Sequence, residues 1–139
     1  MFSIERTYNA PAAKVWRAIT DKEQMKQWYF DIAEFKPEVD FEFQFAGRGA
    51  EGQKYLHLCR IIEVIPEKKL SHSWRYDGLL GSSVVTWELF TEGDTTRVKL
   101  SHEGLESMAG NGPDFAVESF TKGWTMIIGQ NLKEFAEKQ

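Results

Sequence analysis

The sequence lacks several features that would point directly to a function. Cys59 is the single cysteine in 139 residues. One thiol excludes an intrachain disulfide framework and a cysteine-rich zinc site, and it suits a reducing compartment, so a cytoplasmic location is predicted. Basic residues do not form a dense block, since 17 Lys and Arg are set against 21 Asp and Glu, for a net charge of −4. Non-specific binding to nucleic acid is therefore not expected.

Long hydrophobic runs and common catalytic motifs are also missing. No apolar segment approaches the roughly 18 residues that cross a bilayer, so no membrane span is expected. Residues 1–10 show no basic stretch followed by an apolar core, and hence no sign of a secretory signal. Nucleophile-elbow, Walker and dinucleotide-binding glycine motifs are absent. The glycine-rich GRGAEG at 47–52 joins two expected strands and opens no helix, which disfavours a phosphate site.

Aromatic residues are abundant instead. They make up 14% of the chain, as 10 Phe, 5 Trp and 4 Tyr. The length fits one domain, residues 1–139, whose 42% hydrophobic and 27% charged residues are typical of globular proteins. In so small a domain, this many rings require either a densely filled core or a cavity with aromatic walls.

Hydrophobic periodicity predicts one strand and two short helices at the start of the chain. Residues 2–8 alternate with the period of two that is typical of a strand. Pro11 favours a helix start, and apolar residues at three- and four-residue steps continue that helix to about Ile19. Thr20-Asp21 predicts the cap of a second short helix.

The rest of the chain predicts a sheet followed by a long helix. Alternating runs between residues 41 and 102 predict about six more antiparallel strands, although 54–65 is long for one strand. An apolar stripe at about 100° per residue then predicts a helix from about Ala116 to Glu137. The fold class is therefore α+β: a curved antiparallel sheet of about seven strands wrapped around a long C-terminal helix, known as a helix grip.

Particular residues resemble those of a known family. The segment APAAKVWRAITDKEQMKQW (10–28) has Pro11, Val15, Trp16, Thr20, Asp21 and Trp28 at the family's spacing. Further matches are Glu63, Pro66, Leu70, Trp74, the Thr96-Arg97-Val98 run and Gly123-Trp124. In these positions the chain is similar to the activator of heat-shock protein 90 ATPase homologue-like family, in the START/Bet v-like (SRPBCC) superfamily, over nearly its whole length.

The resemblance implies a hydrophobic pocket between the sheet and the long helix. Members of the superfamily use that pocket for lipids, sterols, polyketides or plant hormones, as carriers or, in a few cases, as cyclases. A resemblance in fold does not indicate which of these uses applies to this chain. The chaperone activator engages its partner through another domain, so its co-chaperone role is not carried over by name.

Polar groups at inward-facing positions are the candidate ligand contacts. His72 and His102 each share the apolar face of a strand, and Asn131 lies in the stripe of the last helix. The direction of His57 stays open, because its strand is apolar on both faces. Burying such a group without a partner costs about 1–3 kcal/mol, so each needs an internal partner, water or a ligand. The predicted pocket residues are Phe43, Phe45, Tyr55, His57, His72, Trp74, Tyr76, Trp87, His102, Phe120, Trp124, Ile128 and Asn131.

No metal ligand, cofactor or catalytic residue is assigned. The three histidines do not lie at the spacing of a ligand pair, and no carboxylate accompanies them. Cys59 has no neighbouring base in the sequence, which favours a buried, inert thiol.

The predicted function is non-enzymatic binding of a small hydrophobic or lipid-like molecule. Two alternatives stay open. One is a protein-interaction module of the co-chaperone or stress-response kind, with Trp28, Tyr29 and Phe30 as an exposed patch. The other is a cyclase- or dehydratase-type enzyme with a pocket histidine as general base. The oligomeric state, monomer or dimer, is also left open.

Overall fold

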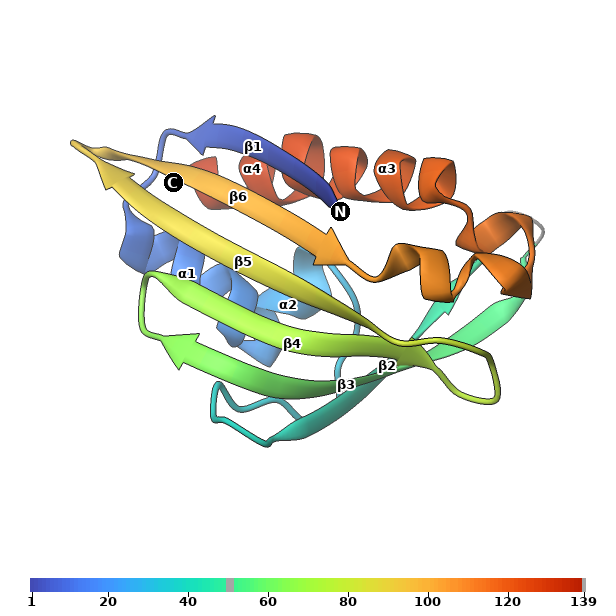
Figure 1. The fold of residues 1–139 in the computed structure, drawn as a ribbon. Helices are drawn as coiled ribbons and strands as arrows, with labels where there is room; N and C mark the ends of the chain where they lie inside the picture. The colour runs from blue at the N-terminus through green and yellow to red at the C-terminus, as the bar shows by residue number, and fades with distance from the viewer. Residues whose placement is uncertain (50–51, 139) are drawn as a thin grey trace.

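A computed structural model of the chain, which describes residues 1–49 and 52–138, has one antiparallel sheet curled around a long C-terminal helix (Figure 1). The predicted α+β helix-grip fold is confirmed. In chain order the elements are β1 (Phe2–Tyr8), α1 (Ala12–Thr20), α2 (Lys22–Trp28), β2 (Glu42–Arg48), β3 (Lys54–Ile65), β4 (Lys69–Tyr76), β5 (Ser83–Glu92), β6 (Thr95–Glu103), the short turns η1 (Leu105–Ser107), η2 (Ala109–Asn111) and η3 (Pro113–Phe115), and the helical run α3 (Val117–Met126), η4 (Ile127–Asn131) and α4 (Leu132–Glu137).

The sheet has six strands in the described residues, not about seven. Its order is β1-β6-β5-β4-β3-β2, and all neighbours are antiparallel. The long segment Lys54–Ile65 stays one strand, with a shift in register between Ile61 and Glu63. A bulge of this kind bends a strand without ending it, which allows β3 to follow the curve of the sheet.

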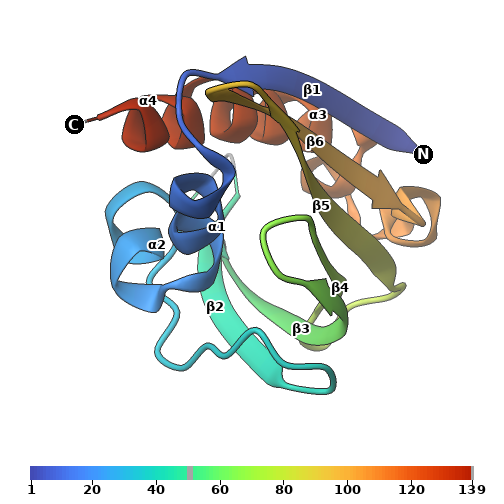
Figure 2. The same cartoon turned by 90° about the vertical axis from the view of Figure 1, so that its left-hand side faces the viewer.

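The two short helices close the open side of the curve. In Figure 2 the sheet runs round from β1 to β2, with α1 and α2 between the C-terminal helix and β2. The carboxylate of Asp21 accepts a hydrogen bond from the Glu23 amide at 3.0 Å, so the predicted cap of α2 is confirmed. The indole of Trp28 donates to the Ala18 carbonyl at 2.8 Å and joins α2 to α1.

The long helix contains one wide turn. In a regular α-helix, residues four apart drift by about 40° around the axis. The buried positions on this helix nevertheless recur at every fourth residue: Phe120, Trp124, Ile128, Leu132 and Ala136. Over Ile127–Asn131 the turn is a π-helix, closed by the Leu132 amide on the Ile127 carbonyl. Its extra residue offsets the drift and keeps the stripe on the sheet.

The wide turn also makes a bond to the first strand. The hydroxyl of Tyr8, itself fully buried, donates to the Ile128 carbonyl at 2.5 Å. Tyr8→Phe is expected to lower the free energy of unfolding by about 1–3 kcal/mol, because a buried carbonyl then loses its partner. Urea denaturation at neutral pH measures the change. A variant as stable as the wild type would show that water replaces the hydroxyl at this position.

None of the helices in the described residues is both long and apolar enough to cross a membrane.

Candidate functional site

Most of the predicted pocket residues meet inside the curve of the sheet. Eleven of them are at most 8% exposed: Phe43, Phe45, His57, His72, Trp74, Tyr76, Trp87, His102, Phe120, Trp124 and Ile128. Tyr55 is half-buried at one end of this interior. The direction of His57, which the sequence leaves open, is inward.

Asn131 does not lie with the others. It is half-buried in a shallow groove at the surface, beside Trp28 and Phe135. With regular α-helical geometry Asn131 and Phe135 would follow Ile128 on the inner stripe. The π turn places Leu132 and Ala136 there instead, so the predicted position of Asn131 on the inner stripe is wrong.

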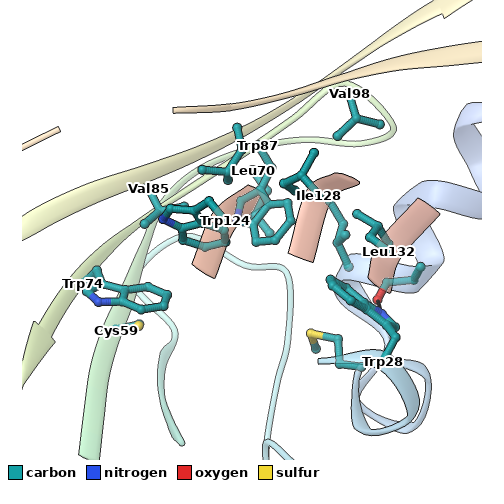
Figure 3. Close-up of a cluster of buried hydrophobic side chains, with 14 of the residues drawn as sticks. Trp28, Cys59, Leu70, Trp74, Val85, Trp87, Val98, Trp124, Ile128 and Leu132 are labelled. Carbon is teal, nitrogen blue, oxygen red and sulfur yellow. Dashed lines mark hydrogen bonds between the residues drawn. The ribbon is translucent and has the colours of Figure 1, made fainter. Parts of the chain in front are cut away.

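The centre of the interior is packed with indole rings. Trp124 on α3 lies 5.5 Å from Trp74 and 5.6 Å from Trp87, measured between ring centroids. Figure 3 shows these side chains meeting from the helix and the sheet, with Ile128 and Leu132 continuing the helix side. Towards α2 the remaining void next to Trp87 is only about 10 Å³. The aromatic residues at the centre therefore form a core.

Two buried histidines each accept a hydrogen bond from a tryptophan. The indole of Trp124 donates to His102 Nδ1 at 3.0 Å, so the proton of this imidazole is on Nε2 and is donated to Ser83 Oγ at 2.7 Å. The Ser83 hydroxyl in turn donates a hydrogen bond to the Trp74 carbonyl at 2.8 Å. A serine beside a histidine can form a nucleophilic pair, but here the imidazole donates to the hydroxyl and cannot remove its proton.

His72 is held in the same way with the opposite tautomer. The Trp87 indole donates to Nε2 at 3.2 Å, and Nδ1 donates to the Ser73 carbonyl at 2.9 Å. Because Nε2 accepts a hydrogen bond it carries no proton, so the ring is neutral.

Burial keeps all three histidines neutral near pH 7. It lowers the pKa to about 4 for His57 and His72 and to about 3 for His102, where neighbouring His72 adds to the effect. A general base works best with a pKa near the working pH and a free lone pair that faces the substrate. His72 and His102 have neither, so they serve as structural hydrogen-bond partners of the tryptophans.

A cleft opens beside this core, at the end where Gly49 and Tyr55 lie against η3. Its volume is about 380 Å³. Its aromatic lining comes from the α2–β2 connection, β3, β4 and η3, and consists of Phe30, Tyr55, His57, Tyr76 and Phe115. Exposed Arg48 and Lys122 lie at its rim. The arrangement offers flat apolar walls with cationic side chains at the opening.

Stacked rings form the floor of this cleft. His57 lies on Phe45 with centroids 4.4 Å apart and planes 16° apart. Phe30 packs on Phe45 at 4.5 Å and lies 5.7 Å from His57, so the three rings form one contiguous cluster. Tyr76 contacts His57 at 4.6 Å and Phe115 at 4.8 Å. Position 47 requires a glycine, because a Cβ there would come within 2.7 Å of the His57 ring.

The wall nearest η3 is fixed by a hydrogen bond. The Tyr55 hydroxyl donates to the Asp114 carboxylate at 2.8 Å, and the Tyr55 ring packs against Phe115 at 5.0 Å. These contacts join β3 to the turns that lead into α3. They set the width of the cleft.

Sequence reasoning missed several of the cleft residues. Phe30, Asp114 and Phe115 lie in connections without periodicity, and Ser119 and Lys122 lie off the apolar stripe of α3. The only signal in the sequence was the pair of aromatic residues next to turn-forming residues, Phe30 before Asp31 and Phe115 after Pro113.

The predicted exposed patch at the end of α2 is also corrected. Trp28 is 8% exposed, and Tyr29 and Phe30 are half-buried. The chain turns inward after α2, so these rings pack on the sheet and are not the fully exposed patch that was predicted.

Comparison with known families agrees with the helix-grip fold. Residues 9–137 match the family described as activator of Hsp90 ATPase homolog 1-like protein. The chain belongs to this family. Among curated proteins none is significantly similar in sequence.

Solved structures share the fold of this family member over almost its entire length. Protein CV1439 from Chromobacterium violaceum is 22% identical with a TM-score of 0.83, and the match covers 99% of this chain and 97% of that one. MLL2253 from Mesorhizobium loti is 25% identical with a TM-score of 0.76, covering 96% and 94%. DynU16, a protein in the dynemicin biosynthetic locus, is 20% identical with a TM-score of 0.78, and here the match covers 98% of this chain but 46% of that one. These likenesses establish the fold.

Proposed function

We propose that the domain binds a small, mainly apolar molecule with an anionic or polar end, and that the cleft between β3, β4 and η3 is where it binds. The observation that carries the proposal is the cleft itself, with five aromatic side chains along it and two cations at its rim. Its volume of about 380 Å³ lies within the range of pockets for small ligands, which are mostly apolar with a few placed polar groups.

The chemistry of the lining favours binding over catalysis. Burial lowers the pKa of His57 to about 4, and its Nδ1 is 3.2 Å from the Tyr55 carbonyl. The Tyr55 hydroxyl is already bonded to Asp114. Apolar burial would supply the affinity, at about 25 cal/mol per Å² removed from water. Arg48 and Lys122 would hold the charged end near the solvent.

Titration with the dye anilinonaphthalene sulfonate tests this proposal, because the dye combines fused aromatic rings with an anionic group. The wild type is expected to bind it saturably, and native mass spectrometry of protein purified from cells is expected to show a bound small molecule. Ser119 lines the cleft from α3, so Ser119→Trp should fill the space and weaken dye binding by about tenfold or more.

The matched control is Glu118→Trp, which adds the same ring at the neighbouring, exposed position outside the cleft. Its dye affinity should equal that of the wild type. If the wild type takes up no dye and carries no co-purified molecule, or if both tryptophan variants bind alike, the cleft is not a binding site.

A further inference from the structure

Two aromatic rings that follow α2 occupy space inside the curve of the sheet. Residues 29–41 connect α2 to β2 without a helix or strand. Phe30 stacks on Phe45 and lines the cleft. Tyr29 lies one layer deeper, with its ring 4.8 Å from Trp28 and 6.0 Å from Trp87. We refer to Tyr29 and Phe30 as the aromatic plug.

Beyond the Tyr29 amide, which donates to the Met25 carbonyl at 2.7 Å, side-chain packing holds the plug in place. Across the described residues, no backbone–backbone hydrogen bond involves residues 30–35. The one bond to their backbone runs from the exposed Lys22 ammonium to the Ala33 carbonyl at 3.1 Å. A ring of another molecule that stacks equally well on Phe45 could therefore replace Phe30 without the loss of any backbone hydrogen bond.

The Tyr29 hydroxyl is unusual in this molecule. Within residues 1–49 and 52–138 it is the one buried side-chain polar atom without a hydrogen-bond partner. Burial, with the Cys59 thiol and the Tyr76 hydroxyl nearby, raises its pKa well above the usual value, so it is a neutral donor. An unpaired buried donor costs about 1–3 kcal/mol. The Tyr29 ring packs edge-on against Phe30 with centroids 4.5 Å apart, so a molecule in the place of Phe30 would lie against Tyr29.

We propose that Phe30 is the displaceable ring of the aromatic plug: a flat aromatic molecule takes its place on Phe45, Tyr29 stays where it is, and an oxygen of that molecule accepts a hydrogen bond from the Tyr29 hydroxyl. The inference rests on the proposed function and specifies its ligand class. The rings of Phe30 and His57 are both nearly parallel to Phe45, with planes 27° and 16° from it. The ring face that Phe30 covers on Phe45 therefore favours a planar ring system over a saturated lipid chain.

Fluorenone and fluorene test the hydrogen bond, since they share one flat ring system and differ by the carbonyl. Their affinities are measured by displacement of anilinonaphthalene sulfonate. We expect the wild type to bind fluorenone about three- to tenfold more tightly, as one neutral hydrogen bond allows. Tyr29→Phe should abolish this preference, leave fluorene binding unchanged and raise the midpoint of thermal unfolding of the free protein. Tyr8→Phe, which removes a buried hydroxyl that already has a partner, should keep the preference.

Removal of the plug ring tests the displacement. Phe30→Ala should tighten the binding of both compounds, because no ring has to leave. Phe35→Ala is the matched control, since Phe35 lies in the same connection and packs on Phe43 at 5.0 Å, outside the cleft lining. It should leave both affinities unchanged.

The outcomes separate the two proposals. A wild type that binds neither the dye nor either compound contradicts the proposed function as a whole. Three results would overturn the displaceable plug and leave the cleft as the binding site. They are dye binding without fluorenone binding, a preference for fluorenone that survives in Tyr29→Phe, and weaker binding by Phe30→Ala.

Discussion

Acidification from pH 7.5 to pH 5 is expected to remove much of the stability of this domain. The cause is the set of three buried histidines. Their pKa values in the folded protein, about 4 for His57 and His72 and about 3 for His102, lie below the value of 6.5 that an unfolded chain has. At pH 5 only the unfolded chain binds these protons.

The sign and size follow from proton linkage. Between pH 6.5 and about 4 the unfolded state holds more protons, so the free energy of unfolding falls as the pH falls through this window. Above pH 6.5 the three histidines are neutral in both states, and their contribution to the free energy of unfolding is fully present. At pH 5 each histidine costs about 2 kcal/mol, and the three together about 6 kcal/mol, which is comparable to the whole stability of a typical domain.

Urea denaturation at pH 7.5, 6 and 5 measures this dependence. His57→Phe is a suitable control, because a phenyl ring can still stack on Phe45 and the site no longer titrates; the fall in stability should then shrink by about one third. Glu137, whose pKa is lowered by the Asn9 amide and by Lys133, loses its contribution only at more acidic pH. An unfolding free energy that stays constant from pH 7.5 to pH 5 would contradict neutral, buried histidines.

Trp124→Ala is expected to be the most damaging single substitution in the core. Trp124 is 2% exposed and touches both Trp74 and Trp87. Truncation of a buried aromatic residue costs about 3–5 kcal/mol because of lost burial and the cavity that is left. The variant also takes away the donor to His102 Nδ1, which adds an unpaired acceptor in the core.

Trp124→Phe separates these two contributions. It keeps a ring at the same position and loses only the N–H donor and part of the ring volume, so a smaller loss of about 1–3 kcal/mol is expected. Urea denaturation at pH 7.5 compares the two variants with the wild type. If Trp124→Ala lost less than about 1 kcal/mol, the space between the helix and the sheet would have to be open rather than packed.

The sequence predicted the sheet well because one face of each strand is buried. On β4 the positions Leu70, His72, Trp74 and Tyr76 all face inward, as their alternation indicates. The same pattern could not separate a core from a cavity wall, since both require aromatic residues on the inner face. A core and a cavity wall are distinguished only by the distances between rings, such as the 5.5 Å between the centroids of Trp74 and Trp124.

Hydrophobic periodicity could not predict two parts of the site. The π turn arises because the helix must follow a curved sheet, and a fixed rotation of about 100° per residue therefore placed Asn131 on the wrong side. The cleft depends on Phe30 and Phe115, which lie outside the strands and the long helix, in segments whose path depends on tertiary packing. Local patterns carry no information on such placement.

The bond between Tyr8 and the Ile128 carbonyl also bears on the order in which the chain folds. It joins residues 120 positions apart, and β1 pairs only with β6. During synthesis the first strand therefore has no partner in the sheet until Glu103 has been made, and no anchor on the helix until Ile128 follows. Contacts this distant in sequence close late and slow folding. A strand that is made before all its partners is thus among the last to take its place.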